Sequence, residues 1–411
     1  MSREVPEGWQ LEKLGSFVEE FKVLDSAGDL PPLSVTKSSG IVFQSDKFNK
    51  RIANTSSSKY KVIRRGEYSY DPMSLYYGAI GRLSVCDVGI VSPAYITFRL
   101  KGIIERCFFD LYIKTTEFLV EVNKVTTGGN QDGKRKKTDW NSFCSLPISL
   151  PPVHEQRRIA EILSSVDETI AATRAVIEQT RRVRSEILST SFPDHRAFEW
   201  STADDTFEGW SIEPASSICE SIIDCKNRTP PVTENGYPVV RTPNVRNGRF
   251  RYDGLQFTDK QSFQEWTARG VPGAGDILFT REAPYGEVCI APAMEFCLGQ
   301  RMMFMRPDTS RVSSDFLLYA LQSGPVKQEM FRRAGGSTVG HLRVGDVREL
   351  PIPVAPKEAQ LRLTSTLRSL DEALDSNEKT LSRLGDCKSA LMSDLLTGRK
   401  RVTDYLPMAA E

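Results

Sequence analysis

Apolar residues recur at alternating spacings of four and three positions along two long segments of the chain. The first seam comprises Ile159, Leu163, Val166, Ile170, Thr173, Ile177, Thr180, Arg184, Ile187 and Ser191. The second comprises Leu363, Leu367, Leu370, Leu374, Asn377, Leu381, Leu384, Lys388, Leu391 and Leu395. This spacing is typical of a coiled coil. Prolines at 151, 152 and 356 precede the segments, and Pro193 and Gly398 follow them. We therefore predict two helices of roughly 40 residues, each about 60 Å long at 1.5 Å per residue.

The two helical segments are copies of one unit. Leu146–Phe192 aligns without a gap on Leu350–Leu396, an offset of 204 residues. A Gly-Trp pair, at positions 8–9 and again at 209–210, marks a similar point before each helix. Self-similarity at a fixed offset indicates a duplicated architecture. Between these landmarks the two globular regions have diverged.

Connectivity predicts how the two helices pair. The region between them joins the end of the first helix to the start of the second, and parallel helices would force it to span roughly 60 Å. We therefore predict an antiparallel pair with a head at each end and approximate two-fold symmetry. Short runs such as Tyr237–Arg241 and Asp276–Thr280 favour strands in the heads. Ser314–Leu321 and Arg106–Val122 favour helices.

The predicted fold is α+β, with two mixed, strand-rich heads separated by an antiparallel coiled coil. The first head spans 1–150 and the second spans 193–355. The first helix spans 151–192, the second spans 356–397, and a tail spans 398–411.

Composition is that of an ordinary soluble protein of 411 residues, with 39% hydrophobic residues, 26% charged residues and a net charge of +1. No run of eighteen apolar residues and no signal peptide is visible. The eight cysteines form no C-x-x-C pair, and only three histidines accompany them. We therefore expect no metal site, and reduced thiols in the cytoplasm.

Sequence signatures of catalysis are missing. The chain has no P-loop, G-x-G-x-x-G, G-x-S-x-G or H-E-x-x-H motif, and no N-P-P-aromatic loop of an adenine methyltransferase. We therefore expect no catalytic residues, and a binding role.

Loops of the second head place Arg, Asn, Tyr and Thr beside glycines and prolines. Arginine can pair with guanine, and asparagine with adenine, in the major groove, whereas small hydroxyl residues contact phosphates. The candidates for DNA contact are Arg228, Thr229, Arg241, Asn244, Arg246, Arg281, Tyr285, Ser337, Thr338 and His341. The alternative for each is an ordinary tight turn or a solvated surface side chain.

The first head is locally basic, because residues 34–70 hold eight Lys or Arg against Asp46 and Glu67. Basic residues interleaved with Tyr and Gly are typical of a nucleic-acid interface. The candidates are Lys59, Lys61, Arg64, Arg65, Tyr76, Tyr77, Arg82, Lys134, Arg135, Lys136 and Lys137. The Gly-rich stretch 127–137 is equally well explained as a mobile loop.

Polar residues interrupt both helical seams at the same places, Thr173 with Asn377 and Arg184 with Lys388. They either set the register of the coiled coil or contact a partner protein. Residues 155–186 contain six acidic and six basic residues. This balance favours spacing and docking over phosphate binding.

The chain resembles the HsdS specificity subunits of type I restriction–modification systems over essentially its whole length. The motifs that carry the resemblance are Leu146-Pro147-Ile148, Pro151-Pro152 and Glu155-Gln156, repeated as Leu350-Pro351-Ile352, Pro356 and Gln360, with Gly275-Asp276-Ile277-Leu278 and Gly335-Gly336-Ser337-Thr338 through His341-Leu342 in the second head. Ala359 replaces the glutamate of the second Glu-Gln pair.

The resemblance implies two target recognition domains that bind the two halves of a split, asymmetric DNA sequence. It implies that the helices act as a spacer and dock two modification (HsdM) subunits, which use S-adenosylmethionine to methylate adenine. Restriction (HsdR) subunits would add cleavage driven by ATP, with Mg²⁺ also on partner subunits. Gln156 and Gln360, with the four polar seam residues, are the candidates for spacing and docking. Two rivals remain: a DNA-modifying enzyme with its own active site, and a two-headed scaffold that binds proteins.

Overall fold

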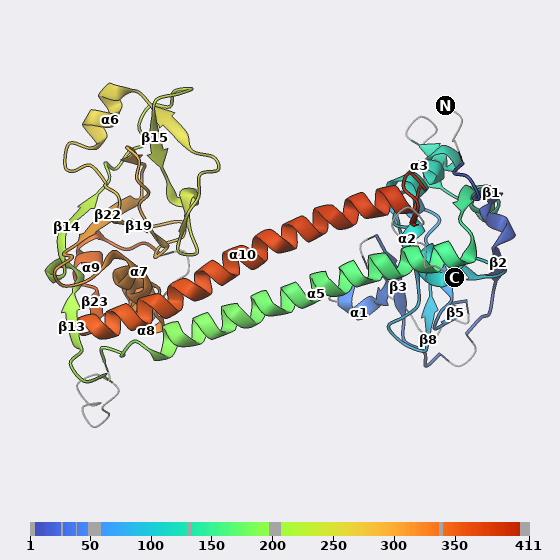
Figure 1. Ribbon diagram of the computed structural model, residues 1–411, viewed down its shortest axis with the longest axis horizontal. Coiled ribbons are helices and arrows are strands. Elements are labelled where there is room, and N and C mark those ends of the chain that lie inside the picture. The colour runs from blue at the N-terminus through green and yellow to red at the C-terminus, as the bar shows by residue number, and fades with distance from the viewer. Residues whose placement is uncertain are drawn as a thin grey trace, which may run out of the picture. The chain divides into compact units, whose positions relative to one another are not determined.

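The computed structural model describes residues 5–25, 28–37, 39–47, 59–129, 134–196, 207–336 and 340–402, with no side-chain placement for Lys47, Gly129, Lys134 and Arg135. The chain forms two compact units. Unit 1 combines Met1–Thr173 with Thr380–Glu411, and unit 2 is Arg174–Lys379. Each unit therefore contains one head and part of both long helices, which Figure 1 draws as single uninterrupted ribbons in green (α5) and red (α10).

The first head is strand-rich and also contains short helices, most of them in its second half. Its strands are β1 (Gln10–Lys13), β2 (Val18–Phe21), β3 (Leu33–Thr36), β4 (Gly40–Phe43), β5 (Lys61–Arg64), β6 (Tyr68–Tyr70), β7 (Ile80–Arg82), β8 (Val88–Val91), β9 (Ile96–Leu100), β10 (Thr127–Gly129), β11 (Lys134–Lys137) and β12 (Pro147–Leu150). Its helices are α1 (Gln44–Lys47), α2 (Arg106–Tyr112), α3 (Thr116–Val125) and α4 (Trp140–Cys144).

The second head has the same mixed character. Its strands are β13 (Ser211–Pro214), β14 (Cys219–Asp224), β15 (Tyr237–Val240), β16 (Val245–Arg246), β17 (Arg249–Phe250), β18 (Gln256–Thr258), β19 (Ile277–Thr280), β20 (Val288–Ile290), β21 (Cys297–Leu298), β22 (Met302–Pro307) and β23 (Pro351–Val354). Its helices are α6 (Lys260–Trp266), α7 (Ser314–Gln322), α8 (Gly324–Arg333) and α9 (Val344–Arg348).

The two heads share one scaffold despite their sequence divergence. The first contains a four-stranded antiparallel sheet in the order β2-β9-β6-β7, and the second contains the equivalent sheet β14-β22-β19-β20. Strand positions follow the buried apolar residues: Phe98 and Phe304 are both at most 1% exposed on their central strands. The similarity of the two heads therefore lies in their strand order and buried core residues, and not in their surface sequences.

A strand pair joins each head to a long helix. In the first head β1 pairs antiparallel with β12, and in the second β13 pairs antiparallel with β23 (Figure 1). The next backbone bond is also repeated, from Leu14 N to Leu146 O (2.8 Å) and from Ala215 N to Leu350 O (2.9 Å). These strands follow the two Gly-Trp pairs, which explains why both landmarks recur in the sequence.

Helices α5 (Val153–Thr190) and α10 (Lys357–Leu395) follow these strand pairs directly. In unit 1 the start of α5, at Ile159 and Leu163, packs with Leu395 at the end of α10. In unit 2 the end of α5, at Leu188, packs with Leu367 near the start of α10. Both units thus contain antiparallel helix pairs, which confirms the predicted direction. None of the helices in the described ranges is long and apolar enough to cross a membrane.

Candidate nucleic-acid interface

Two predicted arginines of the second head lie beside the same turn. Arg241 follows β15 and Arg281 follows β19. Gly299 N donates to Val240 O at 2.8 Å, and Arg281 N donates to Arg301 O at 2.9 Å. The turn 299–301 therefore holds the ends of both strands together. Arg301, which carried no signal in the sequence, is an exposed residue of this turn and pairs with Glu282 at 3.1 Å.

Both predicted arginines keep unused hydrogen-bond donors. The Nε atoms of Arg241 and Arg281 are buried and have no acceptor within the described part of the chain. Arg241 makes one long bond, from Nη2 to Gly254 O at 3.4 Å. Buried donors are almost always paired in folded proteins. Arginines whose donors are not all used within the protein suit an external acceptor, such as a base edge or a phosphate.

The exposed residue His341 belongs to the same surface. Leu342 N donates to Arg281 O at 3.0 Å, which fixes the segment after Gly340 beside Arg281. Ser337 and Thr338, predicted in the same loop, lie outside the described residues. The structure thus gathers Arg241, Arg281 and His341 from three separate stretches of sequence.

Asn244 lies in the interior of the second head and not on its surface. It is fully buried, and its Oδ1 accepts from Arg241 N at 3.0 Å. Its Nδ2 donates to Arg251 O at 3.1 Å and to Asp253 O at 3.2 Å. A contact to adenine would first require breaking these bonds. Asn244 therefore stabilises the β16–β17 hairpin, on which the half-buried Arg246 lies.

The remaining candidates of the second head lie in different surroundings. Arg228 is exposed, ion-paired to Glu265 at 2.6 Å and placed 5.0 Å from the Trp266 ring. Thr229 is exposed, whereas Tyr285 is partly buried against the core of unit 2.

In the first head the structure brings three candidates together. The rings of Tyr76 and Tyr77 lie 4.0 Å apart, and Lys136 Nζ lies 4.9 Å from the Tyr76 ring. Tyr77 and Arg82 line one cavity of about 370 Å³, together with Lys37 and Lys114. Aromatic and basic side chains at one surface suit a nucleic-acid backbone and its bases.

Arg82 is already paired within the first head. Its Nε donates to Asp110 at 2.8 Å, and Tyr68 Oη donates to the same carboxylate at 2.8 Å. Burial lowers the pKa of Arg82, but Asp110 more than offsets this and leaves that pKa raised. Arg82 therefore has less donor capacity available than Tyr77 or Lys136 beside it.

Other basic candidates of the first head differ in exposure. Lys61 is 8% exposed, its ammonium donates to Tyr95 O, and burial lowers its pKa. Lys61 is thus an interior residue and is not available to DNA in this conformation. Arg65 pairs with Asp87 at 2.7 Å. The exposed candidates are Lys59, Arg64 and Lys137, while Lys134 and Arg135 lie in β11 with side chains outside the described set.

Gln156 and Gln360 make the same contacts in the two units. Each Nε2 donates at 2.9 Å to the carbonyl five residues earlier, that of Pro151 or Ala355. Gln156 also accepts from Glu105 N at 2.8 Å, and Gln360 accepts from Ser313 N at 3.3 Å. Their exposures are 0% and 3%. Both amides therefore attach a helix start to its own head, and neither is accessible for docking another subunit.

The polar seam residues divide into two kinds. Thr173 and Asn377 donate to carbonyls of their own helices, those of Thr169 and Ala373, both at 2.8 Å. Arg184 instead pairs with Asp371 across the helices at 2.6 Å, and Lys388 pairs with Asp167 at 2.5 Å. The charged positions therefore set the helix pairing in each unit, which supports the register interpretation.

A buried ion pair that sequence analysis missed fixes the C-terminal segment to unit 1. Glu155 is 1% exposed and accepts two bonds from Arg401, both at 2.8 Å. Trp9 Nε1 donates to the same carboxylate at 3.0 Å. Ala359 occupies the equivalent position in unit 2. The departure from the Glu-Gln motif thus removes an ion pair as well as a sequence match.

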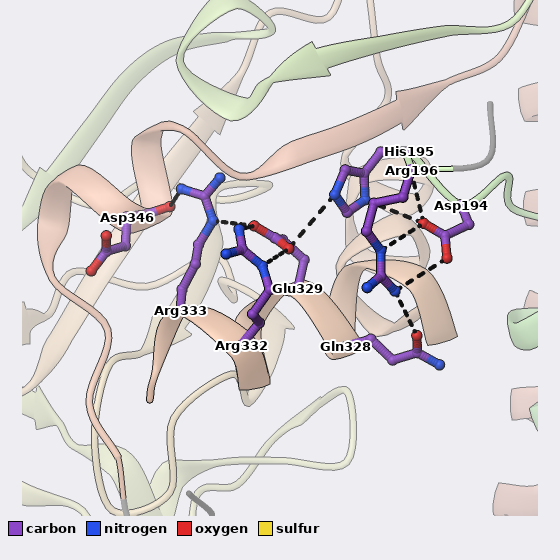
Figure 2. Close-up of polar contacts among 8 residues, drawn as sticks. All are labelled: Asp194, His195, Arg196, Gln328, Glu329, Arg332, Arg333 and Asp346. Atoms are coloured by element: carbon purple, nitrogen blue, oxygen red, sulfur yellow. Dashed lines mark hydrogen bonds and ion pairs between the residues drawn. The ribbon is translucent and has the colours of Figure 1, made fainter. Parts of the chain in front are cut away.

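In unit 2 a different carboxylate gathers charges. Figure 2 shows Arg332 and Arg333 both pointing at Glu329, at 2.5 and 2.6 Å. His195 Nε2 approaches the same group at 3.6 Å, and Arg196 contacts Asp194 and Gln328 (Figure 2). The hydrogen bond from Arg332 is the main cause of a Glu329 pKa lowered to about 2. This cluster connects the segment after α5 to α8, so its role is structural.

The described residues contain no group of three or more His, Cys, Asp or Glu side chains placed to hold a metal ion. All eight cysteines are free thiols. Burial raises the pKa of the Cys219, Cys289 and Cys297 thiols to about 12. These three side chains therefore stay protonated at neutral pH and act as core residues.

Comparison with known proteins identifies a repeated domain. The family described as "Type I restriction modification DNA specificity domain" matches residues 6–181 and again residues 208–384. Among curated proteins, the Type I restriction enzyme MjaVIII specificity subunit of Methanocaldococcus jannaschii is 22% identical over 418 residues, covering 97% of this chain and 94% of that protein.

Solved structures share the fold. A chain from a study of complex assembly and conformational transition in a type I R-M system has a TM-score of 0.59 at 17% identity, covering 97% of this chain and 100% of that chain. The HsdS subunit from Thermoanaerobacter tengcongensis has a TM-score of 0.51 at 19% identity, covering 96% and 98%.

Proposed function

Because this chain belongs to the type I restriction–modification DNA specificity domain family and contains that domain twice, we propose that it is the DNA-recognition subunit of a type I restriction–modification complex. The observation that carries the proposal is the duplication itself. Two copies of a recognition domain in one chain provide one binding surface for each half of a split duplex sequence.

Differences between the two heads support an asymmetric target. The four-stranded sheets have the same order, yet the surfaces around them differ. The second head presents Arg241, Arg281 and Arg301 around one turn, whereas the first presents Tyr76, Tyr77 and Lys136. Different donors and stacking surfaces recognise different base edges. The two half-sites therefore differ in sequence.

The long helices separate the heads along the chain and dock the other subunits. Exposed apolar side chains on α5, Val176 at 49% and Val183 at 36%, support docking of a protein partner. The partners are modification (HsdM) subunits, two per chain, which use S-adenosylmethionine to methylate adenine, and restriction (HsdR) subunits, which use ATP and Mg²⁺. This chain contributes recognition and no catalytic group, and it acts in the cytoplasm.

Mapping methylated adenines in the source genome, with and without this gene, tests the proposal. We expect methylation at a split, asymmetric sequence that disappears when the gene is deleted and returns when it is restored. Unchanged methylation in the deletion strain would contradict the proposal.

The two rival functions give different results in vitro. A DNA-modifying enzyme predicts methyl transfer or cleavage by the purified chain alone, whereas we expect activity only after the modification subunits are added. A protein-binding scaffold predicts no sequence-dependent binding to duplex DNA. We expect such binding, with an affinity that falls as salt rises, because phosphate contacts release counterions.

A further inference from the structure

A basic groove lies within unit 2, between the second head and the two long helices. Its volume is about 670 Å³. Its cationic lining comprises Arg181, Arg184, Arg246, Arg249, Arg251 and Lys327. Among the described residues that line it, two are acidic, Asp371 and Glu378. The groove is therefore strongly cationic, although the net charge of the whole chain is only +1.

The two acidic residues of the groove already form ion pairs with arginines of the same groove. Asp371 accepts from Arg184 Nε at 2.6 Å and from Tyr319 Oη at 2.9 Å. Glu378 accepts from Arg181 at 2.8 Å and from Arg249 at 3.3 Å. Arg249 also pairs with Asp375. These pairs neutralise the charges of Arg181, Arg184 and Arg249, and those of Arg249 bond strand β17 of the hairpin to α10.

Three further cations of the groove have no carboxylate partner within the described ranges. Arg246 contacts only the carbonyl of Val245, at 3.2 Å, and Arg251 is exposed. Lys327 is exposed on α8. Although the residue as a whole is exposed, neighbouring groove side chains partly desolvate the Lys327 ammonium and lower its pKa, and the nearby Glu287 raises that pKa by less. Glu287 itself accepts from Asn247 N at 2.6 Å. An excess of positive charge therefore remains.

A neutral donor adds to this surface. Gln322 is 7% exposed and lines the groove, and its Oε1 accepts from Arg184 Nη2 at 2.8 Å. Its Nε2 is buried and has no acceptor in the described part of the chain. Guanidinium, ammonium and amide donors converging on one groove match the oxygens of a phosphodiester.

Continuity with the arginine surface of the second head indicates which polyanion occupies the groove. Arg246 lies on the β16–β17 hairpin and Arg251 directly follows it, and Asn244 connects that hairpin to Arg241 through hydrogen bonds at 3.0 and 3.1 Å. A duplex that contacts Arg241 has further phosphates along the same strand, one per 3.4 Å or so of helix axis. Arg246 and Arg251 are thus positioned by the hairpin that is also bonded to Arg241, a predicted base contact, while Lys327 lies across the groove lining on α8.

We propose that this groove binds the sugar–phosphate backbone of the DNA beside the second half-site, through Arg246, Arg251 and Lys327, without regard to base sequence. The inference rests on the proposed DNA-recognition function and adds a separate phosphate site to it.

The test measures the salt dependence of DNA affinity for the full-length chain assembled with its modification subunits. The variant is R246Q/R251Q/K327Q, and the matched control is R182Q/K379Q/R383Q, which removes the same charge from exposed helix positions outside the groove. Each lost phosphate contact lowers the slope of log affinity against log salt by about 0.9. We expect a slope smaller by about 2–3 for the groove variant, on target and unrelated duplexes alike, and little change for the control.

A second measurement maps the contacted phosphates with the wild-type protein first and then with the groove variant. Neutral methylphosphonates replace single phosphates along the target duplex. We expect a cluster of sensitive positions beside the second half-site that becomes insensitive in the groove variant. An unchanged slope, a loss that depends on base identity, or lost binding of the modification subunits with the slope retained would each overturn the groove proposal. Absence of salt-dependent DNA binding by the wild-type assembly would instead overturn the proposed function.

Discussion

Arg184 on α5 and Asp371 on α10 form an ion pair at 2.6 Å whose exact repeat, 204 residues away in each case, is Lys388 with Asp167 at 2.5 Å. The two pairs lie in different compact units. Each connects the helices across their seam. The duplication has therefore preserved an interaction, as well as a pattern of apolar residues.

These equivalent pairs differ in environment, so we expect them to differ in energy. Arg184 also donates to Gln322 at 2.8 Å and lies 5.9 Å from the Tyr319 ring, and its side chain is 17% exposed. Asp167, the partner of Lys388, is 47% exposed. We expect R184A to lower the free energy of unfolding by about 2 kcal/mol and K388A by less than about 1 kcal/mol. Denaturant unfolding monitored by hydrogen exchange in each unit would measure both, and equal losses would contradict the prediction.

Arg401, in the C-terminal segment, should contribute strongly to the free energy of unfolding of unit 1. Removing its guanidinium leaves Glu155, 1% exposed, with a buried charge whose remaining side-chain partner among the described residues is Trp9 Nε1. We expect R401A to destabilise unit 1 by about 3 kcal/mol, because breaking a buried pair leaves an uncompensated ion. The control is R399A, whose side chain is 62% exposed and whose loss should cost less than about 1 kcal/mol. Similar melting temperatures for the two variants would argue against the buried pair.

Gln156 and Gln360 should contribute equally and independently. Each alanine variant removes three hydrogen bonds and leaves a backbone amide, Glu105 N or Ser313 N, without its acceptor. We expect each to cost about 1–3 kcal/mol, with hydrogen exchange accelerated only in the unit that contains the substitution. The double variant should equal the sum within about 0.5 kcal/mol. A defect confined to assembly with modification subunits, with exchange unchanged, would restore the docking interpretation.

Glu329 should make unit 2 sensitive to acid. Hydrogen bonds from Arg332 and Arg333 lower its pKa from 4.5 to about 2 in the folded state. A lowered carboxyl pKa stabilises the fold fully above the unfolded value and progressively less as pH falls from about 4.5 to 2. We expect E329Q to be less stable than wild type at neutral pH by about 2 kcal/mol, with the difference shrinking across that interval. E358Q, at 84% exposure, is the control, and a difference independent of pH would refute the assignment.

Arg241 and Arg281 should act on one half-site only. Each guanidinium has a buried Nε without an acceptor among the residues that the structure describes. We expect R241A and R281A each to weaken discrimination at the second half-site by about 1–3 kcal/mol, and to leave the first half-site unchanged. Binding to duplexes with one half-site altered at a time would measure this, with the exposed K260A as control. Uniform weakening at both half-sites would identify them as phosphate contacts.

The parts of the fold that depend on local periodicity were predictable. The seam residues, the Gly-Trp landmarks and the leading prolines predicted the positions of two helices. In the structure these helices span Val153–Thr190 and Lys357–Leu395. The antiparallel direction followed from chain connectivity. The repeated sheet order was not predictable, because the heads have diverged and short strands of two to six residues leave little pattern to align.

The candidate site was predictable only in part. Arg241 and Arg281 were candidates for DNA contact because of their residue type, and the structure places them at one turn. Residue type also nominated Asn244 and Lys61, whose side chains are buried and hydrogen-bonded. Composition cannot distinguish a surface asparagine from one that stabilises a hairpin, because both occur beside glycines in loops. Arg301 and the basic groove had no sequence signal, since their members meet only across elements.

The sequence by itself determined the duplication and the coiled-coil seam, because periodicity and repeated motifs are properties of neighbouring residues. Its resemblance to specificity subunits indicated the class of target. Tertiary structure decided which polar side chains remain available to a ligand. Gln156 and Gln360 are buried and bond each helix start to its own head. Glu155 pairs with Arg401, which lies near the other end of the chain. The groove residues Arg246, Arg251 and Lys327 retain a positive charge that no carboxylate among the described residues pairs with. The physical reason is that burial and pairing depend on residues distant in sequence, and these two factors fix the free energy of every charged or hydrogen-bonding group.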